Sequence, residues 1–272
     1  HELAGKARPE NEITLTEKSG KAIDQPPEQM QNKERKQAPP VRKQPAAVQR
    51  LQFCFQRRGG LKYLSHLDII KLLQMGCIRA GFLPAYSEGF NPMPKMRFLP
   101  PLPLGYESRE ELFDILLVAR VDPEQARLAL DHALPDEMPV LSTEALPLKS
   151  QPPEQRLQHS VFEIKIPGDV MNEAELNADS LQEAIADFNR SESFQFTKPA
   201  RGKKKARNLE LKNFVLGVEC EKIDERGVLV RMTLSHQAED YANPLLCLQA
   251  ICGKALRFED GVDVIAESRI ID

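Results

Sequence analysis

The order of hydrophobic patterns constrains the fold of this chain more than any other feature of its sequence. Alternating apolar and polar residues over 51–57 predict a half-buried strand, and near-helical spacing predicts a helix from Ser65 to about Ala80. The expected core face of this helix consists of Leu67, Ile70, Leu73 or Met75, and Cys77. Further elements are expected as strands at 84–86, 95–99, 111–119 and 138–146, and as a helix at 122–134. This order is typical of a ferredoxin-like α+β sandwich.

The same order of patterns recurs in the C-terminal half. A strand is predicted over 160–166 and a helix over 180–190, where Ser180 and Glu183 match a capping box. Further strands, a last helix and a closing strand follow. We therefore expect an α+β protein of two tandem ferredoxin-like βαββαβ sandwiches. The expected units are a disordered linker over 1–50, a first half over 51–147, a linker over 148–158 and a second half over 159–272.

The N-terminal segment has a composition unlike the rest. Residues 1–50 are rich in Pro, Lys, Glu and Gln and contain no Phe, Tyr or Trp. Such a segment buries too little apolar surface to offset the entropy of ordering, so we expect an extended, disordered linker. The chain begins at His1, which suggests the C-terminal part of a longer protein. The segment is then either a tether between domains or a tail without function.

The net charge of the chain restricts how it could bind a nucleic acid. A net charge of -3 and a pI near 6.1 argue against a uniformly basic nucleic-acid binder, so any such contact needs a local patch. The concentrated basic run consists of Arg201, Lys203, Lys204, Lys205 and Arg207. Phosphate backbones attract such runs through counterion release, although an isolated run of charges is more often a solvated loop.

Cysteine usage and hydropathy point to a cytoplasmic protein without a metal site. The five cysteines are an odd number without a framework spacing, and most lie in apolar runs, which favours reduced, buried thiols. Cys247 and Cys252 lie on an apolar helix and read as core residues rather than metal ligands. No CxxxCxxC motif occurs, so no iron–sulfur cluster is expected in this segment. No apolar run approaches the roughly 18 residues of a membrane span.

The segment LSHLD, residues 64–68, is the first candidate site. Ser65 can accept a hydrogen bond from the amide of Asp68, and Asp68 can reach back to the amide of Ser65, as in a capping box. Capping therefore explains Asp68 better than catalysis does. His66 stands at the first helical position, where an imidazole can donate, accept or carry a proton near neutral pH. His66 and Asp68 are thus weak catalytic candidates.

The segment SEGFNPMPK, residues 87–95, is the second candidate site. A simple turn needs only one or two special residues, whereas this loop combines a hydroxyl, an amide side chain, glycine, two prolines and positive charge. Such a loop can hold an anion such as phosphate, although a purely architectural role is equally supported. The candidate substrate-binding residues are Ser87, Gly89, Asn91, Lys95 and Arg97.

These segments together resemble a known family. Between Gln52 and Ser108, LSHLD is followed by AYSEGFNPMPK and PLPLGYES, which is similar to the radical-SAM-linked domain family of unknown function. Members of that family carry an LSHLD-type segment, an AYSxGFNPxPK-type loop and a PLPLGxES-type segment. The chain departs from the common form of the loop at Met93, where a basic residue or histidine often stands.

The resemblance implies partners and cofactors that the residues alone do not. Family members occur alone or fused to the C-terminus of a radical SAM protein with a cobalamin-binding-like domain. An iron–sulfur cluster, S-adenosylmethionine and cobalamin are then expected only in an upstream domain or a partner protein, in cis or in trans, with residues 1–50 as the tether. No cofactor is expected in this segment itself. The family's association with ribonuclease genes implies RNA as a ligand.

Three functions stay open at this point. The first is a non-catalytic accessory domain that binds RNA or another anionic substrate, using the basic run and a surface shared by His66, Ser87, Asn91 and Lys95. The second is an RNA-processing or RNA-modifying enzyme with His66 as general acid/base, Asp68 as orienting group and Lys95 as electrostatic stabiliser. The third is a structural interaction module, in which the loop only packs.

Overall fold

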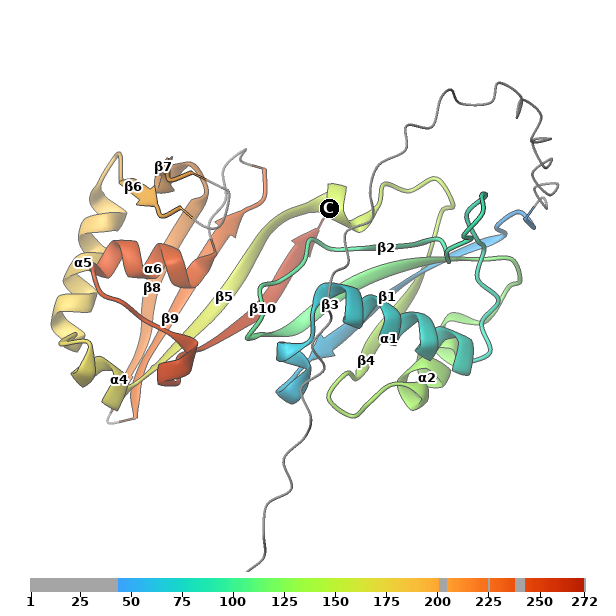
Figure 1. Ribbon diagram of the computed structural model, residues 1–272, viewed down its shortest axis with the longest axis horizontal. Helices are drawn as coiled ribbons and strands as arrows, with labels where there is room; N and C mark the ends of the chain where they lie inside the picture. Colours follow the sequence, from blue (N-terminus) through green and yellow to red (C-terminus); the bar gives the residue numbers. More distant parts are fainter. Residues whose placement is uncertain (1–43, 201–204, 225, 238–242, 272) are drawn as a thin grey trace, which may run out of the picture. The chain divides into compact units, whose positions relative to one another are not determined.

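The computed structural model describes residues 44–200, 205–224, 226–237 and 243–271 (Figure 1). Most of the expected linker over 1–50 therefore lies outside the described residues, as do Arg201, Lys203 and Lys204 of the basic run. The described residues all belong to one compact unit. The described part is an α+β fold with a mostly antiparallel sheet.

The first half of the sheet is built from strands that surround β1. The elements are β1 (Gln49–Arg57), α1 (His66–Arg79), β2 (Met96–Phe98), β3 (Tyr106–Leu117), α2 (Pro123–Ala133) and β4 (Val140–Leu146), with a 3-10 turn at Gly59–Tyr63. β1 pairs antiparallel with both β3 and β4, and β2 pairs antiparallel with β3. The strand order is therefore β4–β1–β3, with the short β2 on the outer side of β3.

The described part of the second half contains six strands and four helices. Its strands are β5 (Leu157–Pro167), β6 (Gln195–Lys198), β7 (Arg207–Glu210), β8 (Val215–Asp224), β9 (Gly227–Ser235) and β10 (Asp263–Ile271). Its helices are α3 (Pro153–Arg156), α4 (Gly168–Glu173), α5 (Ala178–Arg190) and α6 (Pro244–Cys252), with 3-10 turns at Leu211–Asn213 and Phe258–Asp260. The order is β10–β5–β9–β8, and β6 and β7 form a separate two-stranded sheet.

One short parallel pairing joins the halves into a continuous sheet. Val264–Ala266 of β10 lies beside Tyr106–Ser108 of β3 in parallel register. β2 pairs with residues 113–115, further along β3. The same edge of β3 therefore pairs first with β10 and then with β2. Eight described strands form this sheet.

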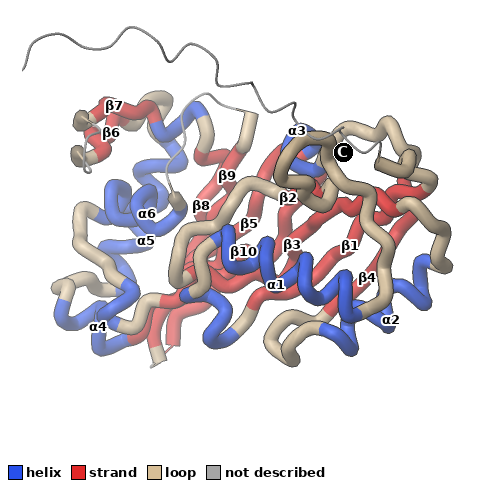
Figure 2. The backbone as a smooth tube through the Cα atoms, turned by 45° about the vertical axis from the view of Figure 1, so that its right-hand side comes forward, coloured by secondary structure: helices blue, strands red, loops and turns tan. Residues whose placement is uncertain are grey.

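Each half has its own apolar core. In the first core, Leu51 and Phe53 of β1 pack with Phe113 of β3 and with buried residues of α1 and α2. Figures 1 and 2 show α1 and α2 on one face of these strands. The second core lies between the β5, β8, β9 and β10 strands and the helices α5 and α6. Tyr106 at the start of β3 belongs to the second core, where its ring contacts Phe162 and Phe258.

Caps explain where several helices begin. Asp122 and Asn243 accept hydrogen bonds from the amides three residues later, at 3.0 and 2.8 Å, as expected for α2 and α6. The expected start of α5 at Ser180 is wrong. Asn177 caps this helix by accepting from the amide of Ser180 at 2.7 Å, because an asparagine three residues upstream caps as well as serine does.

Some other expectations also need correction. β3 begins at Tyr106 rather than at 111, and residues 84–86 form isolated bridges at Pro84 and Tyr86 instead of a strand. The expected linker over 148–158 contains α3 and the start of β5. Leu67 and Met75, expected in the core, are exposed, because α1 carries apolar residues around most of its circumference. The helix buries the expected Leu73 and Cys77 together with Ile69. None of the described helices is both long and apolar enough to span a membrane.

Candidate functional site

The loop SEGFNPMPK folds into a closed hairpin, named here the 85–95 hairpin. The amide of Ser87 donates to the carbonyl of Met93 at 2.8 Å, and the amide of Lys95 donates to the carbonyl of Ala85 at 2.7 Å. The Ser87 hydroxyl accepts from the amide of Met93 at 3.0 Å. Gly89, in the turn, has a φ of 125°, which a side chain would disfavour. The hydroxyl of Ser87 therefore holds the turn closed, and Asn91 is exposed near its tip.

A pocket of about 450 Å³ opens at the base of this hairpin. Its polar and flexible lining includes Arg50, Ser87, Met93, Lys95, Arg97 and Asp114. The pocket lies on the sheet face opposite α1. Met96 and Phe98 of β2 pack against the first core, and side chains alternate along a strand, so Lys95 and Arg97 point to the other face.

The floor of the pocket is a buried ionic network. The Nε atom of Arg50 donates to Oδ2 of Asp114 at 2.8 Å, and the Nε2 atom of Gln52 donates to Oδ1 at 2.7 Å. Arg50 also donates to the carbonyl of Gln151 at 2.9 Å and to that of Ser150. Both buried charges are thus compensated, as burial requires, and the floor is electrically neutral.

The cations at the rim give the pocket its net charge. Lys95 is exposed, and Arg97 is 70% exposed, with the carboxylate of Glu154 at 3.7 Å. An exposed pair at that distance is weak and is screened by salt. Because the floor is neutral, the rim cations favour an anionic ligand.

His66 lies at the start of α1, where Ser65 caps the helix. The Ser65 hydroxyl accepts from the amide of Asp68 at 3.3 Å and donates to its carboxylate at 2.6 Å. The carboxylate accepts from the hydroxyl rather than from the Ser65 amide that a capping box would use. This hydrogen bond, together with Lys71, lowers the pKa of Asp68. Asp68 is therefore engaged in capping.

Behind His66 lies a buried cluster of charged residues. Arg269 contacts both carboxylate oxygens of Glu111 at 3.0 Å and donates to the carbonyl of Pro100 at 2.8 Å. Arg57 is buried and donates to the carbonyl of Tyr106 at 2.7 Å. With two arginines and one glutamate, this cluster carries a net positive charge. Its members come from the first half and from β10, at the point where the halves join.

The surroundings of His66 favour its neutral form. The ring packs edge-on against Phe98, with centroids 5.9 Å apart. Burial lowers the pKa of His66, Glu111 opposes this shift, and Arg57 and Arg269 add to it. His66 is therefore an uncharged imidazole at neutral pH.

The structure separates residues that the sequence analysis placed on one surface. Ser87, Lys95 and Arg97 lie together at the pocket, with Gly89 and Asn91 in the turn above its base. His66 instead contacts Phe98, on the face that α1 covers. His66 and Lys95 thus lie on opposite faces of the sheet, because alternate residues of β2 serve the two sides.

The basic run is only partly described. Arg201, Lys203 and Lys204 lie outside the described residues, whereas Lys205 and Arg207 are exposed next to and within β7. β6 and β7 pair antiparallel, so the described members Lys205 and Arg207 belong to a second hairpin.

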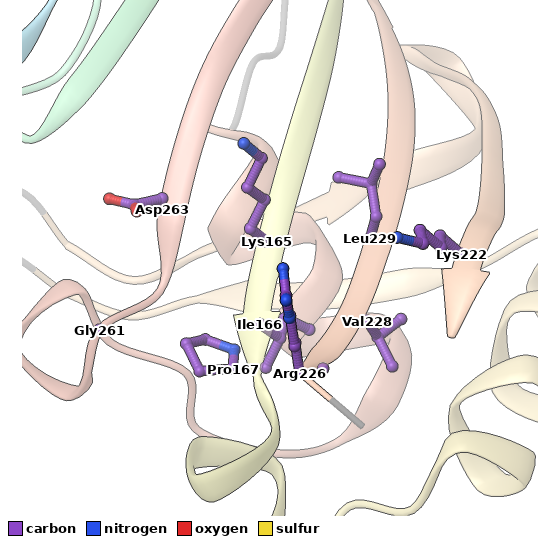
Figure 3. Close-up of a pocket in the computed structure, with 10 residues that line it drawn as sticks. Lys165, Ile166, Pro167, Lys222, Arg226, Val228, Leu229, Gly261 and Asp263 are labelled. Carbon is purple, nitrogen blue, oxygen red and sulfur yellow. The ribbon is translucent and has the colours of Figure 1, made fainter. Parts of the chain in front are cut away.

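A second cavity, of about 460 Å³, lies in the second half at the start of β9 and β10. Figure 3 shows Lys165, Arg226 and Lys222 around the β5 and β9 strands, with Asp263 on the β10 side. Lys62 donates to Asp263 at 3.0 Å, so the acidic member is already engaged. Gly227 is required here, because an added Cβ would lie 2.1 Å from the carbonyl oxygen of Ile166.

Sequence reasoning missed several residues of these sites. Asp114 interrupts the apolar strand ELFDILLVA, and Arg50 precedes the alternating segment LQFCFQR; these isolated charges in strand patterns were the available signal. Arg57, Glu111 and Arg269 come from distant parts of the chain, so nothing in the sequence relates them. Among the described residues, no group of three or more His, Cys, Asp or Glu side chains is arranged to hold a metal ion.

Comparison with known proteins assigns the family. The family model of DUF2344, described as an uncharacterised protein conserved in bacteria, matches residues 50–244. The chain belongs to the DUF2344 family. The match spans β1 through the start of α6 and includes both the 85–95 hairpin and the basic run. No curated protein matches the sequence significantly.

Two solved structures show distant similarity to the chain. The chain is similar to a chain in the crystal structure of a Cbf5-Nop10-Gar1 complex, with 12% identity and a TM-score of 0.37, over 78% of this chain and 47% of that one. This chain thus spans about half the length of that relative. An unknown protein from Galdieria sulphuraria is also similar, with 12% identity and a TM-score of 0.24, over 79% of this chain and 95% of that one.

Proposed function

We propose that this DUF2344 chain is a non-catalytic accessory module that binds RNA or another anionic substrate for a radical SAM partner. The observation that carries the proposal is the pocket beneath the 85–95 hairpin, where Lys95 and Arg97 stand at the rim of a neutral, hydrogen-bonded floor. The chain as a whole is acidic, so anion binding depends on this local arrangement.

The basic run supplies a second contact in this proposal. Lys205 and Arg207 are exposed, and Arg201, Lys203 and Lys204 adjoin them in the sequence. A polyanion long enough to reach both the pocket and the basic run binds with higher affinity than either contact alone provides, because the second contact forms within the same complex. A small anion can contact only the pocket, so its affinity depends on the pocket alone.

The partner in this proposal is a radical SAM domain or protein, in cis or in trans. Its support is the resemblance of the LSHLD, GFNPMPK and PLPLGYES segments to the radical-SAM-linked family. The iron–sulfur cluster, S-adenosylmethionine and cobalamin belong to that partner, and residues 1–50 are the tether in the fused form. The setting is the cytoplasm.

We further propose that each half is a ferredoxin-like unit. The strand order β4–β1–β3–β2 of the first half is equivalent to the order β10–β5–β9–β8 of the second. In each half, one helix follows the first strand and another precedes the last strand. The support is this equivalence of order and connection.

One observation favours an enzymatic alternative with His66 as general acid/base. The imidazole is half-buried, is neutral near pH 7 and lies beside the Arg57–Glu111–Arg269 cluster, which could stabilise an anionic substrate. Asp68 does not orient it, because its carboxylate is engaged by Ser65. RNA turnover by the full chain, abolished by His66→Ala, would replace the accessory proposal by this one.

RNA binding measured against salt concentration tests the accessory proposal. We expect the full chain to bind a fluorescently labelled single-stranded RNA, with an affinity that falls as salt rises from about 50 to 200 mM. Each phosphate contact to a single strand contributes about −0.7 to the slope of log K against log salt, so Lys95→Ala/Arg97→Ala reduces the slope by about 1.4. Lys203→Ala/Lys204→Ala/Lys205→Ala reduces it further.

Lys71→Ala is the matched control. Lys71 is 72% exposed on α1, on the face opposite the pocket, so its removal leaves the slope unchanged. Binding that is indifferent to salt, to the pocket variant and to the triple variant overturns the proposal. Absence of any anion binding leaves the structural-module alternative, in which the hairpin only packs.

A further inference from the structure

Phe90 stands at the tip of the 85–95 hairpin with its ring in solvent. It is 80% exposed, more than any other large apolar side chain in the described part of the chain. Its neighbours in the turn, Gly89 and Asn91, are also exposed. Single exposed apolar residues are common on proteins, so exposure alone assigns nothing.

The setting of Phe90 separates it from an ordinary surface residue. Two backbone hydrogen bonds and the Ser87 hydroxyl close the hairpin below it, and Tyr86 pairs with Pro94 in an isolated bridge. The aromatic ring is therefore carried on an ordered support. A ring that is held in solvent before a ligand arrives loses little conformational freedom on binding.

The cations of the pocket lie at the base of the same hairpin. Lys95 is five positions after Phe90, so a fully extended chain would place the two Cα atoms no more than about 18 Å apart. Arg97 follows on the same face. An exposed aromatic ring and positive charge within reach of one strand are the combination with which proteins hold unstacked bases and their phosphates.

We propose that Phe90 is a base-stacking platform and that the ligand of the pocket is single-stranded nucleic acid, with one base on the Phe90 ring and a phosphate at Lys95 and Arg97. This inference rests on the proposed anion-binding function and specifies its substrate class. A paired base is already stacked on both sides, so a duplex cannot use the ring without being opened. The ligand is an oligonucleotide rather than a single nucleotide, because ring and cations are separated along the hairpin.

Glu88 is the acidic group of this turn and opposes the proposed ligand. It is exposed beside Gly89. A carboxylate at the tip repels a phosphate that passes close to it, with a strength that salt screens. Glu88→Gln therefore tightens RNA binding by a few-fold at most, at the low end of the salt range.

Binding by Phe90 variants of the full chain tests the inference. The probes are a labelled single-stranded RNA oligomer, the same strand annealed to its complement, a ribonucleoside monophosphate and inorganic polyphosphate. We expect Phe90→Ala to weaken single-strand binding about tenfold, Phe90→Trp to retain or tighten it, and neither to change polyphosphate binding. The single strand binds more tightly than the duplex or the monophosphate.

Met75→Ala provides the matched control. Met75 is 58% exposed on α1, away from the pocket face, so its truncation leaves binding of every probe unchanged. Phe90 is too exposed to support the fold, so Phe90→Ala keeps the wild-type thermal transition, and a loss of binding cannot be assigned to unfolding.

The outcomes distinguish the two proposals. If polyphosphate and RNA bind equally and Phe90→Ala changes neither, stacking is overturned while the anion site stands. Stacking is likewise overturned if the duplex binds as tightly as the single strand and Phe90→Ala weakens the binding of neither. If polyphosphate and every RNA fail to bind, the proposed anion-binding function falls, and stacking falls with it.

Discussion

Two hairpins, each between a helix and a strand of the main sheet, use their side chains in opposite ways. The 85–95 hairpin lies between α1 and β2, and the β6–β7 hairpin lies between α5 and β8. Each therefore connects a helix of its half to the next strand of the main sheet. Each also carries positive charge, in Lys95 and Arg97 or in Lys205 and Arg207.

The β6–β7 hairpin is part of the second core. Leu209 is buried, and Phe194, which leads into β6, packs edge-on against Phe188 of α5 with centroids 5.2 Å apart. Glu210 accepts from the amide of Phe194 at 2.6 Å and from the side chain of Gln195 at 2.8 Å. The apolar residues of the β6–β7 hairpin therefore face the second core.

The 85–95 hairpin exposes the equivalent kind of residue. Phe90 and Met93 are exposed, and the surface below is the ionic Arg50–Asp114 floor instead of an apolar core. The same connection is thus used for packing in one half and leaves an aromatic ring and a pocket open in the other. This difference is why we assign ligand binding to the first half and a supporting contact to the second.

The largest expected effect concerns the floor under the first hairpin. Asp114→Ala leaves the buried Arg50 without its partner and lowers the free energy of unfolding by about 3–5 kcal/mol, measured by urea denaturation. Arg50→Met/Asp114→Leu, which removes both charges, costs much less than the single change. Equal losses in both variants would show that the ion pair is not what supports the pocket.

The next largest effect on stability comes from truncating one apolar side chain in each hairpin. Leu209→Ala lowers the free energy of unfolding by about 2–5 kcal/mol, because it leaves a cavity in the second core. Phe90→Ala changes it by no more than about 0.5 kcal/mol, since its ring is in solvent. Both are measured in the same denaturation experiment. A large loss for Phe90→Ala would mean that the first hairpin packs as the second does.

Each half is expected to lose stability in acid through a histidine whose pKa is lowered by burial. Burial lowers the pKa of His236, which follows β9, to about 4, with contributions from Arg269 and His159. Between about pH 6.5 and pH 4 the unfolded state binds a proton that the folded state does not, so stability falls as the pH falls through this window. In thermal melts against pH, His236→Gln flattens this part of the profile.

The first half adds to the acid effect with the same sign. Burial also lowers the pKa of His66, so His66→Gln removes a share of the loss below about pH 6.5. A histidine proton titration by NMR locates each transition. A pKa of His66 above its ordinary value would contradict the buried, neutral ring described here.

A small effect on stability is expected at the rim of the pocket. Arg97→Gln breaks an exposed pair with Glu154 and changes the free energy of unfolding by less than about 1 kcal/mol. We expect Arg97→Gln to change the free energy of RNA binding by more than it changes the free energy of unfolding. The opposite result would make Arg97 a structural residue and weaken the contrast between the two hairpins.

The local elements of the fold follow from the sequence. Alternation in LQFCFQR predicts β1, Ser65 and Asp122 predict the starts of α1 and α2, and the order of elements predicts an α+β fold. These features depend on neighbours within a few residues, such as a cap and the amide three positions later. The 85–95 hairpin was likewise visible as an unusual run of turn and polar residues.

Tertiary structure decided which of these residues meet. Alternation along β2 sends Lys95 and Arg97 to one face and Phe98, with His66, to the other, and the strand pairing of β3 brings Asp114 beside Arg50 and Gln52. The pairing of β10 with β3 likewise places Arg269 at Glu111, far away in the sequence. Sequence by itself determined the elements, their caps and the candidate loop, because those depend on local bonding. Which face each side chain occupies depends on pairing register, and a register is set only when distant strands come together.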